Sequence, residues 1–147
     1  MTKKNMVSAV LFLALSLAGV WLAFSRVESF RNARRLKASL TALPQGTTTL
    51  EEAVPFDWEA VYSFEPYTSR EEIARTIGFD SPEIAETIGE GVTQLIFVRE
   101  DRVVLCVCAY PENLGYDVDF TGCVRYGEHT PFTVRQGSVV RLCREAV

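Results

Sequence analysis

The chain has 147 residues, of which 48% are hydrophobic and 23% are charged, and its formal net charge is −4. These values are typical of one globular domain and exclude a disordered tail, a collagen-like repeat and a disulfide-dense mini-protein. The acidic balance disfavours a nucleic-acid-binding protein, because such proteins usually carry a basic surface.

The first predicted element is an apolar helix near the N-terminus. Residues 6–24 form a run of 19 residues without a charged side chain, preceded by two lysines. A helix of that length is about 28 Å long, close to the ~30 Å hydrocarbon core of a bilayer. We therefore predict a transmembrane signal anchor over residues 1–25. The alternatives are a cleaved signal peptide, whose best small-x-small site at Ser16–Ala18 lies inside the run, and a buried core helix.

Residues 26–43 are predicted to continue as a basic juxtamembrane helix. Apolar residues recur in it at three- and four-residue spacing, which gives one apolar stripe. The stripe consists of Val27, Phe30, Ala33, Leu36, Leu40 and Leu43. A solvated stem, a helix docked on the following domain and a short coiled coil all fit this pattern, and the basic residues could attract anionic lipid head groups. Pro44 ends the helix, and we predict a linker over 44–55.

Residues 56–147 are predicted to form the folded domain, beginning with a strand and two short helices. Alternation over 56–64 indicates a strand with one apolar face, formed by Trp58, Ala60, Tyr62 and Phe64. Ser69 to Glu72 is a capping box, and Gly78 suits the end of the helix that it begins. Residues 80–89 suggest a second helix, with Ile84 and Ile88 facing inward.

Strands dominate the rest of the domain. Residues 92–99 and 102–110 flank Glu100–Asp101 and predict a hairpin, and 116–121 can form a short strand. A second hairpin is expected from 132–135 and 138–143. Helices early and strands late indicate an α+β fold, with a small antiparallel sheet that carries the two short helices on one face.

The start of this domain also carries a resemblance to a known group of proteins. Its residues Phe56, Trp58, Val61, Tyr62, Phe64, Pro66–Ser69, Glu71–Ile73 and Gly78 follow a recurrent pattern. The pattern, F-x-W-x-x-V-Y-x-F-x-P-Y-T-S-x-E-E-I, resembles one found in small secreted or membrane-anchored proteins of Gram-positive bacteria, and the resemblance covers roughly residues 56–110. Many of those proteins have a lipobox cysteine, whereas the first cysteine here is Cys106. The resemblance implies an extracytoplasmic domain, and it provides no activity or catalytic residues that could be carried over to this chain. The charges that flank the apolar run favour a cytoplasmic C-terminus by the positive-inside rule, whereas the very short N-terminus before the run argues for the opposite orientation. Without the resemblance, the orientation therefore stays open.

All four cysteines lie in the predicted domain. They are Cys106, Cys108, Cys123 and Cys143. Cys106 and Cys108 are two residues apart on a strand, so their side chains point the same way and should not bond each other. Outside the cell, cross-strand disulfides of Cys106 or Cys108 with Cys123 or Cys143 are possible, and the favoured disulfide involves Cys123 and Cys143. The alternatives are four reduced thiols packed as small hydrophobic residues and a Cys₄ zinc site, for which the paired C-x₂-C spacing is missing.

Other candidate residues offer little chemistry. The one histidine, His129, lies in a predicted loop, and no nucleophile motif surrounds any serine. Asp117 and Asp119 could form a carboxylate pair but are better explained as solvated charges. The aromatic residues Trp58, Tyr62 and Tyr67 are candidate binding residues of an exposed patch, although core packing would also account for them.

The sequence thus predicts a single-pass cell-membrane protein with an extracytoplasmic interaction or structural domain. Its expected partners are the lipid bilayer and an unidentified envelope protein, with no nucleic acid, no cofactor and no catalytic residue. The alternative is a metal- or thiol-dependent envelope enzyme, or a regulator of one, based on Cys106/Cys108 or Asp117/Asp119. Residues 1–43 carry seven basic and one acidic residue, and 44–147 carry eight basic and eighteen acidic residues. An acidic domain on a basic stem is therefore expected.

Overall fold

The computed structural model describes residues 3–87 and 89–145 and confirms the α+β class. The helices are α1 (Lys3–Thr41), α2 (Leu50–Ala53), α3 (Arg70–Ile77) and α4 (Pro111–Leu114). The strands are β1 (Gly46–Thr49), β2 (Ala60–Ser63), β3 (Thr93–Arg99), β4 (Arg102–Ala109), β5 (Tyr116–Asp119), β6 (Gly122–Arg125), β7 (Pro131–Arg135) and β8 (Val140–Arg144).

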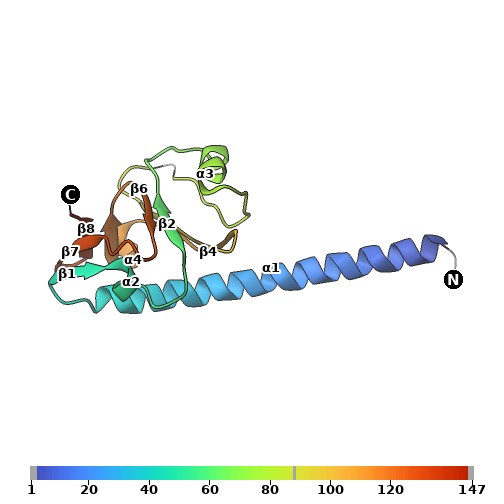
Figure 1. Cartoon of the computed structure of the whole chain (residues 1–147), viewed down its shortest axis with the longest axis horizontal. Helices are drawn as coiled ribbons and strands as arrows, with labels where there is room; N and C mark the ends of the chain where they lie inside the picture. Colours follow the sequence, from blue (N-terminus) through green and yellow to red (C-terminus); the bar gives the residue numbers. More distant parts are fainter. Residues whose placement is uncertain (1–2, 88, 146–147) are drawn as a thin grey trace.

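Helix α1 joins the apolar run and the basic segment in one uninterrupted helix of 39 residues. Its C-terminal part runs along the domain, and its N-terminal part projects beyond it (Figure 1). In the described part of the chain, it is the one helix long and apolar enough to cross a membrane, a test that a signal sequence would also pass. Its apolar side chains from Met6 to Phe24 are exposed, so the domain itself provides no cover for them.

The strands form two four-stranded sheets, not the single antiparallel sheet that the sequence predicts. One sheet has the order β1-β7-β8-β5, and the other has the order β4-β3-β2-β6. All neighbouring strands are antiparallel except β5 and β8, which pair in parallel. The difference arises because the two predicted hairpins lie in different sheets, with β3 and β4 in one and β7 and β8 in the other. Two short strands that the sequence does not predict, β1 and β6, each extend one of these sheets.

Two apolar clusters explain this arrangement. The main core receives residues from both sheets and from α1 and α2, including Leu36, Leu50, Phe97 and Phe132. The second cluster lies on the other face of the β4-β3-β2-β6 sheet, where α3 contributes Ile73 and Ile77. Strand β3 is buried on both faces, since Leu95 and Phe97 enter the main core while Ile96 and Val98 enter the second cluster.

The predicted linker over 44–55 is replaced by β1 and α2. Three consecutive threonines favour an extended edge strand, and β1 pairs with β7. The hydroxyl of Thr49 accepts a hydrogen bond from the backbone N–H of Glu52 and caps α2, while Leu50 and Ala53 are buried. This segment is therefore part of the domain and covers its core.

One of the two predicted short helices forms. Ser69 caps α3 by accepting from the N–H of Glu72, and Gly78 ends it with a left-handed φ of 96°. Over the described part of 80–89 there is a turn and no helix. There, Asp80 accepts from the backbone N–H of Ser81, a local bond that competes with helix formation. Ile84 is buried as expected, and Ile88 lies outside the described residues.

The hairpin of β3 and β4 turns at Glu100–Asp101 as predicted. Both residues have positive φ, 50° and 55°, as in the tight turns that match strand twist, although neither is glycine. The register shifts between Phe97 and Val98, which leaves Val104 as an extra residue on β4. This bulge lies beside α1.

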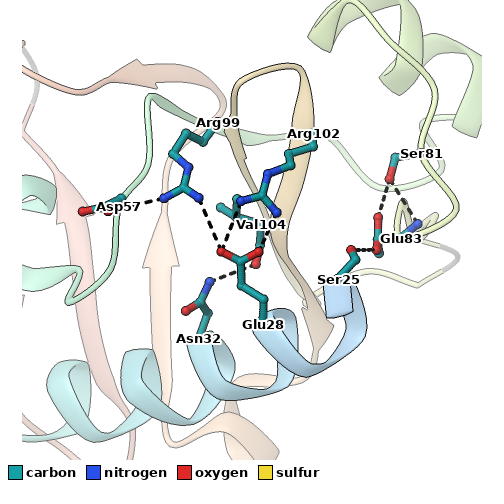
Figure 2. A network of polar contacts seen from close by, with 9 residues as sticks. All are labelled: Ser25, Glu28, Asn32, Asp57, Ser81, Glu83, Arg99, Arg102 and Val104. Carbon is teal, nitrogen blue, oxygen red and sulfur yellow. Dashed lines mark hydrogen bonds and ion pairs between the residues drawn. The ribbon is translucent and has the colours of Figure 1, made fainter. Parts of the chain in front are cut away.

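Helix α1 packs along β4, the edge strand of its sheet. The side-chain amide of Asn32, which is 5% exposed, donates to the carbonyl of Val104 at 3.1 Å (Figure 2). Further along α1, Leu36 and Leu40 are fully buried in the main core. The helix thus covers an edge that would otherwise present unpaired backbone groups.

Candidate functional site

The candidate site is a cleft of about 760 Å³ between α1 and the domain. Its α1 wall contains Glu28, Arg31 and Arg35 on successive turns. The opposite wall is the segment from Glu51 to Trp58, which follows β1 and includes α2. Arg99 and Tyr126 complete the lining.

An ionic network holds one end of the cleft together. Glu28 on α1 accepts from Arg102 at 2.5 Å and pairs with Arg99 at 3.5 Å (Figure 2). Arg99 also reaches Asp57 at 3.4 Å. The Glu28 side chain is only 14% exposed, so removal of both arginines would leave its poorly solvated charge without a partner. The network ties α1 to the β3–β4 hairpin.

Aromatic side chains form another part of the cleft. Trp58 is 4% exposed, and its ring makes edge-to-face contacts with Phe97 at 6.0 Å and Tyr126 at 5.3 Å between centroids. Phe56 meets Phe97 in the same manner at 5.2 Å. These contacts fix the Trp58 ring at the boundary between the main core and the cleft.

Three buried polar atoms, on residues that line the cleft, have no hydrogen-bond partner in the described structure. They are Glu51 Oε2, Trp58 Nε1 and Arg99 Nε. Buried polar atoms in proteins are nearly always paired, so their occurrence along one cleft calls for an explanation. A bound water, or a ligand whose complementary groups reach these atoms, would supply the missing partners.

Glu51 enters this arrangement as a carboxylate. Its Oε1 accepts from the backbone N–H groups of Gly127 at 2.9 Å and His129 at 3.0 Å. Burial by itself would raise the pKa of Glu51, but these N–H donors, together with its own N–H and the Thr49 hydroxyl, hold the pKa below its usual value. The contribution of His129 is therefore its backbone N–H, which helps to hold the Glu51 carboxylate in place.

Arg31 and Arg35 supply the unpaired positive charge of the cleft. Both side chains are exposed, and neither makes an ion pair with any residue that the structure describes. Residues four apart lie on the same helix face, so the two guanidinium groups serve the same side of α1. Their fork of N–H donors suits carboxylate or phosphate oxygens.

The three predicted aromatic binding residues do not converge. Trp58 lies in the cleft wall, ahead of β2, and joins the main core. Tyr62 points to the other face of its sheet, stacks on Phe64 at 6.2 Å and packs against the second cluster. Tyr67 is 66% exposed with a positive φ of 67°. Strand alternation begins only at Ala60, which is why Trp58 does not share the Tyr62 face.

The structure does not bring the predicted disulfide partners together. All four cysteines are free thiols in the part of the chain that it describes. Val124 and Leu142 enter the main core, so their neighbours Cys123 and Cys143 point to the outer faces of two different sheets. Cys106 and Cys123 share one face, but two strands separate them, which at about 4.8 Å per strand exceeds the reach of a disulfide.

The remaining candidates for chemistry are separate from the cleft. Burial raises the pKa of Cys106 to about 11, so this thiol is protonated at neutral pH. Asp117 accepts from the Thr93 hydroxyl at 2.6 Å and pairs with Arg141 at 3.6 Å, while Asp119 is exposed. Among the described residues, no three metal-binding side chains come close enough together to hold an ion.

Of the residues that line the cleft, the sequence predicts Trp58 as a binding residue but not the others. The spacing of Arg31 and Arg35 was visible on the predicted helix, but nothing in it showed which surface they face. Glu51 lay in the predicted linker, and Arg99 is brought near it only by the sheet. No family model, curated protein or solved structure matches this chain.

Proposed function

We propose that this chain is a single-pass membrane protein whose α+β domain is an extracytoplasmic interaction module held directly at the bilayer surface. The observation that carries the proposal is the continuity of α1. One helix supplies both the exposed apolar run and the buried residues Leu36 and Leu40 of the main core.

Contact between α1 and the domain begins where the apolar run ends. Ser25 follows Phe24 directly, is 7% exposed and donates a hydrogen bond to Glu83 (Figure 2). Glu28 joins its two arginines one turn later. A helix rises about 1.5 Å per residue, so these contacts lie within about 6 Å of the end of the apolar run. The domain would therefore be attached rigidly, without a flexible tether.

The extracytoplasmic placement is supported by the resemblance of residues 56–110 to secreted and membrane-anchored proteins. The basic residues of α1 would otherwise favour a cytoplasmic domain by the positive-inside rule. Arg31 and Arg35 line the cleft, however, so these two charges can be explained by a role in the cleft and not only by the orientation of α1 in the membrane. An interaction role is supported by the cleft itself, which offers several unpaired hydrogen-bonding groups in one place.

Fractionation and labelling test the proposal. The full chain should stay in membranes after an alkaline carbonate wash and keep its N-terminal residues. Ser138→Cys places a thiol in the exposed β7–β8 turn, and a membrane-impermeant maleimide should label it in intact cells above the level of the unaltered chain. A shorter soluble product would contradict the anchor. Labelling above that control only after lysis would reverse the orientation.

A further inference from the structure

We propose that the cleft between α1 and the domain binds a phosphate ester that carries hydroxyl groups. The ligand would be either a lipid head group of the surrounding bilayer or a soluble polyol or sugar phosphate. This inference rests on the proposed interaction function but does not depend on which side of the membrane the domain occupies.

The cleft has more free donors than acceptors. Arg31 and Arg35 present two unpaired guanidinium groups from one face of α1. Trp58 Nε1 and Arg99 Nε add two buried N–H donors without a partner. Such a donor set calls for a ligand rich in acceptor oxygens, and arginine forks match the oxygens of a phosphate group.

The carboxylates of the cleft indicate that the ligand also carries a hydrogen-bond donor. Glu28 and Asp57 already bond to arginines, whereas Glu51 keeps one oxygen unpaired although the low pKa of this carboxyl leaves it ionised. A hydrogen-bond donor on the ligand would satisfy that oxygen, and a fully ionised bare phosphate has no such donor. A hydroxyl group on the same molecule would bond Glu51 while the phosphate lies toward the arginines of α1.

The position of the cleft arginines along α1 is compatible with either a lipid head group or a soluble phosphate ester as the ligand. Arg31 and Arg35 are seven and eleven residues beyond Phe24, which corresponds to about 10 and 16 Å along the helix. That places the cleft just outside the apolar run, within reach of a large head group and open to soluble molecules. The aromatic wall of Phe56, Trp58 and Tyr126 would pack against the carbon skeleton of the ligand.

The experiment uses the full chain with Trp21→Phe, which leaves Trp58 as the one tryptophan. In maltoside micelles, glycerol phosphate is titrated against sodium sulfate at equal ionic strength. In nanodiscs, phosphatidylcholine alone is compared with mixtures that contain phosphatidylglycerol. Trp58 fluorescence and the unfolding temperature report binding, since a ligand that binds the folded state stabilises it.

The matched variants are Arg31→Gln/Arg35→Gln, in the cleft, and Arg26→Gln/Arg34→Gln, which removes the same charge from α1 outside it. All four side chains are exposed, so both variants should fold with unchanged unfolding temperatures in the absence of ligand. We expect a saturable response to glycerol phosphate or to phosphatidylglycerol. The cleft variant should weaken it about tenfold or more, and the control less than about twofold.

Each outcome decides the matter. A response to glycerol phosphate in micelles without one to phosphatidylglycerol in nanodiscs identifies a soluble ligand. A response to phosphatidylglycerol in nanodiscs, with or without one in micelles, identifies a lipid head group. Equal weakening by both variants, an equal response to sulfate, or no response in either arm would overturn the phosphate site. Such a failure in a chain that still resists carbonate extraction would leave the proposed membrane anchoring untouched.

Discussion

Truncation of Leu36 tests whether the C-terminal half of α1 is part of the domain or only a stem. Leu36 is fully buried in the main core, among residues from both sheets. In a solvated stem, by contrast, a leucine could be shortened without consequence. The substitution Leu36→Ala therefore separates two of the roles that the sequence left open for this helix.

The expected loss follows from the complete burial of the side chain. A leucine truncated to alanine in a close-packed core loses transfer free energy and leaves a cavity, which together cost about 3 kcal/mol. For a domain of this size, each kcal/mol corresponds to about 4 °C in unfolding temperature, so the variant should unfold about 10 °C lower. Val27→Ala on the same helix shortens a side chain that is 63% exposed and should change the unfolding temperature by about 2 °C or less.

Thermal unfolding of the full chain in micelles, followed by Trp58 fluorescence in the Trp21→Phe background, provides the assay. The Leu36→Met variant, which keeps the volume of the side chain, should recover most of the lost stability. If Leu36→Ala and Val27→Ala unfold at the same temperature as the parent chain, α1 is not packed on the core. The inferred rigid attachment of the domain would then be refuted.

Three further predictions concern other parts of the domain. Asp101→Gly relieves a non-glycine residue at φ 55° in the hairpin turn and should raise stability by about 0.5–1 kcal/mol, measured by denaturant unfolding. Alkylation of Cys106, followed by peptide mass spectrometry, should speed up about tenfold per pH unit above neutral and level off only near pH 11, because burial raises its thiol pKa to about 11. The lowered pKa of Glu51 means that its ionised form contributes stability above about pH 4.5, and that this contribution is lost as the pH falls through the folded-state value. Glu51→Gln should accordingly unfold at a lower temperature than the parent at pH 7, with a gap that narrows below about pH 4; a constant gap would show that the carboxylate charge has no part in it.

Several elements could be predicted because the signals for them are local. The apolar run of α1, the capping box at Ser69, the glycine at position 78 and the β3–β4 hairpin each depend on residues a few positions apart. The helix predicted over 80–89 is absent from the described residues for a local reason too. The Asp80 carboxylate accepts a hydrogen bond from the backbone N–H of Ser81, which competes with helix formation. The sequence predicts a linker in place of β1, because the threonine run of a short edge strand has no distinguishing pattern until its partner strand is known.

The cleft, by contrast, could not be predicted, because it depends on contacts between residues that are distant along the chain. Its walls come from α1, from the segment between β1 and β2, and from the β3–β4 hairpin, and no spacing in the chain relates Arg35 to Glu51 or Arg99. The positions of the cysteines could not be predicted for the same reason. Strand pairing across the whole domain determines the sheet and the face on which each thiol lies. Sequence alone left their pairing open among several schemes.

Taken by itself, the amino-acid sequence determined that an apolar helix precedes a small acidic α+β domain, because hydrophobic periodicity, caps and turns act over a few residues. The folded chain shows in addition that this helix enters the core, that the strands divide into two sheets, and that a cleft with unpaired donors lies between Arg31 and Trp58. The physical reason is that burial and polar pairing are properties of surfaces brought together by folding, and the residues that form those surfaces are distant along the chain.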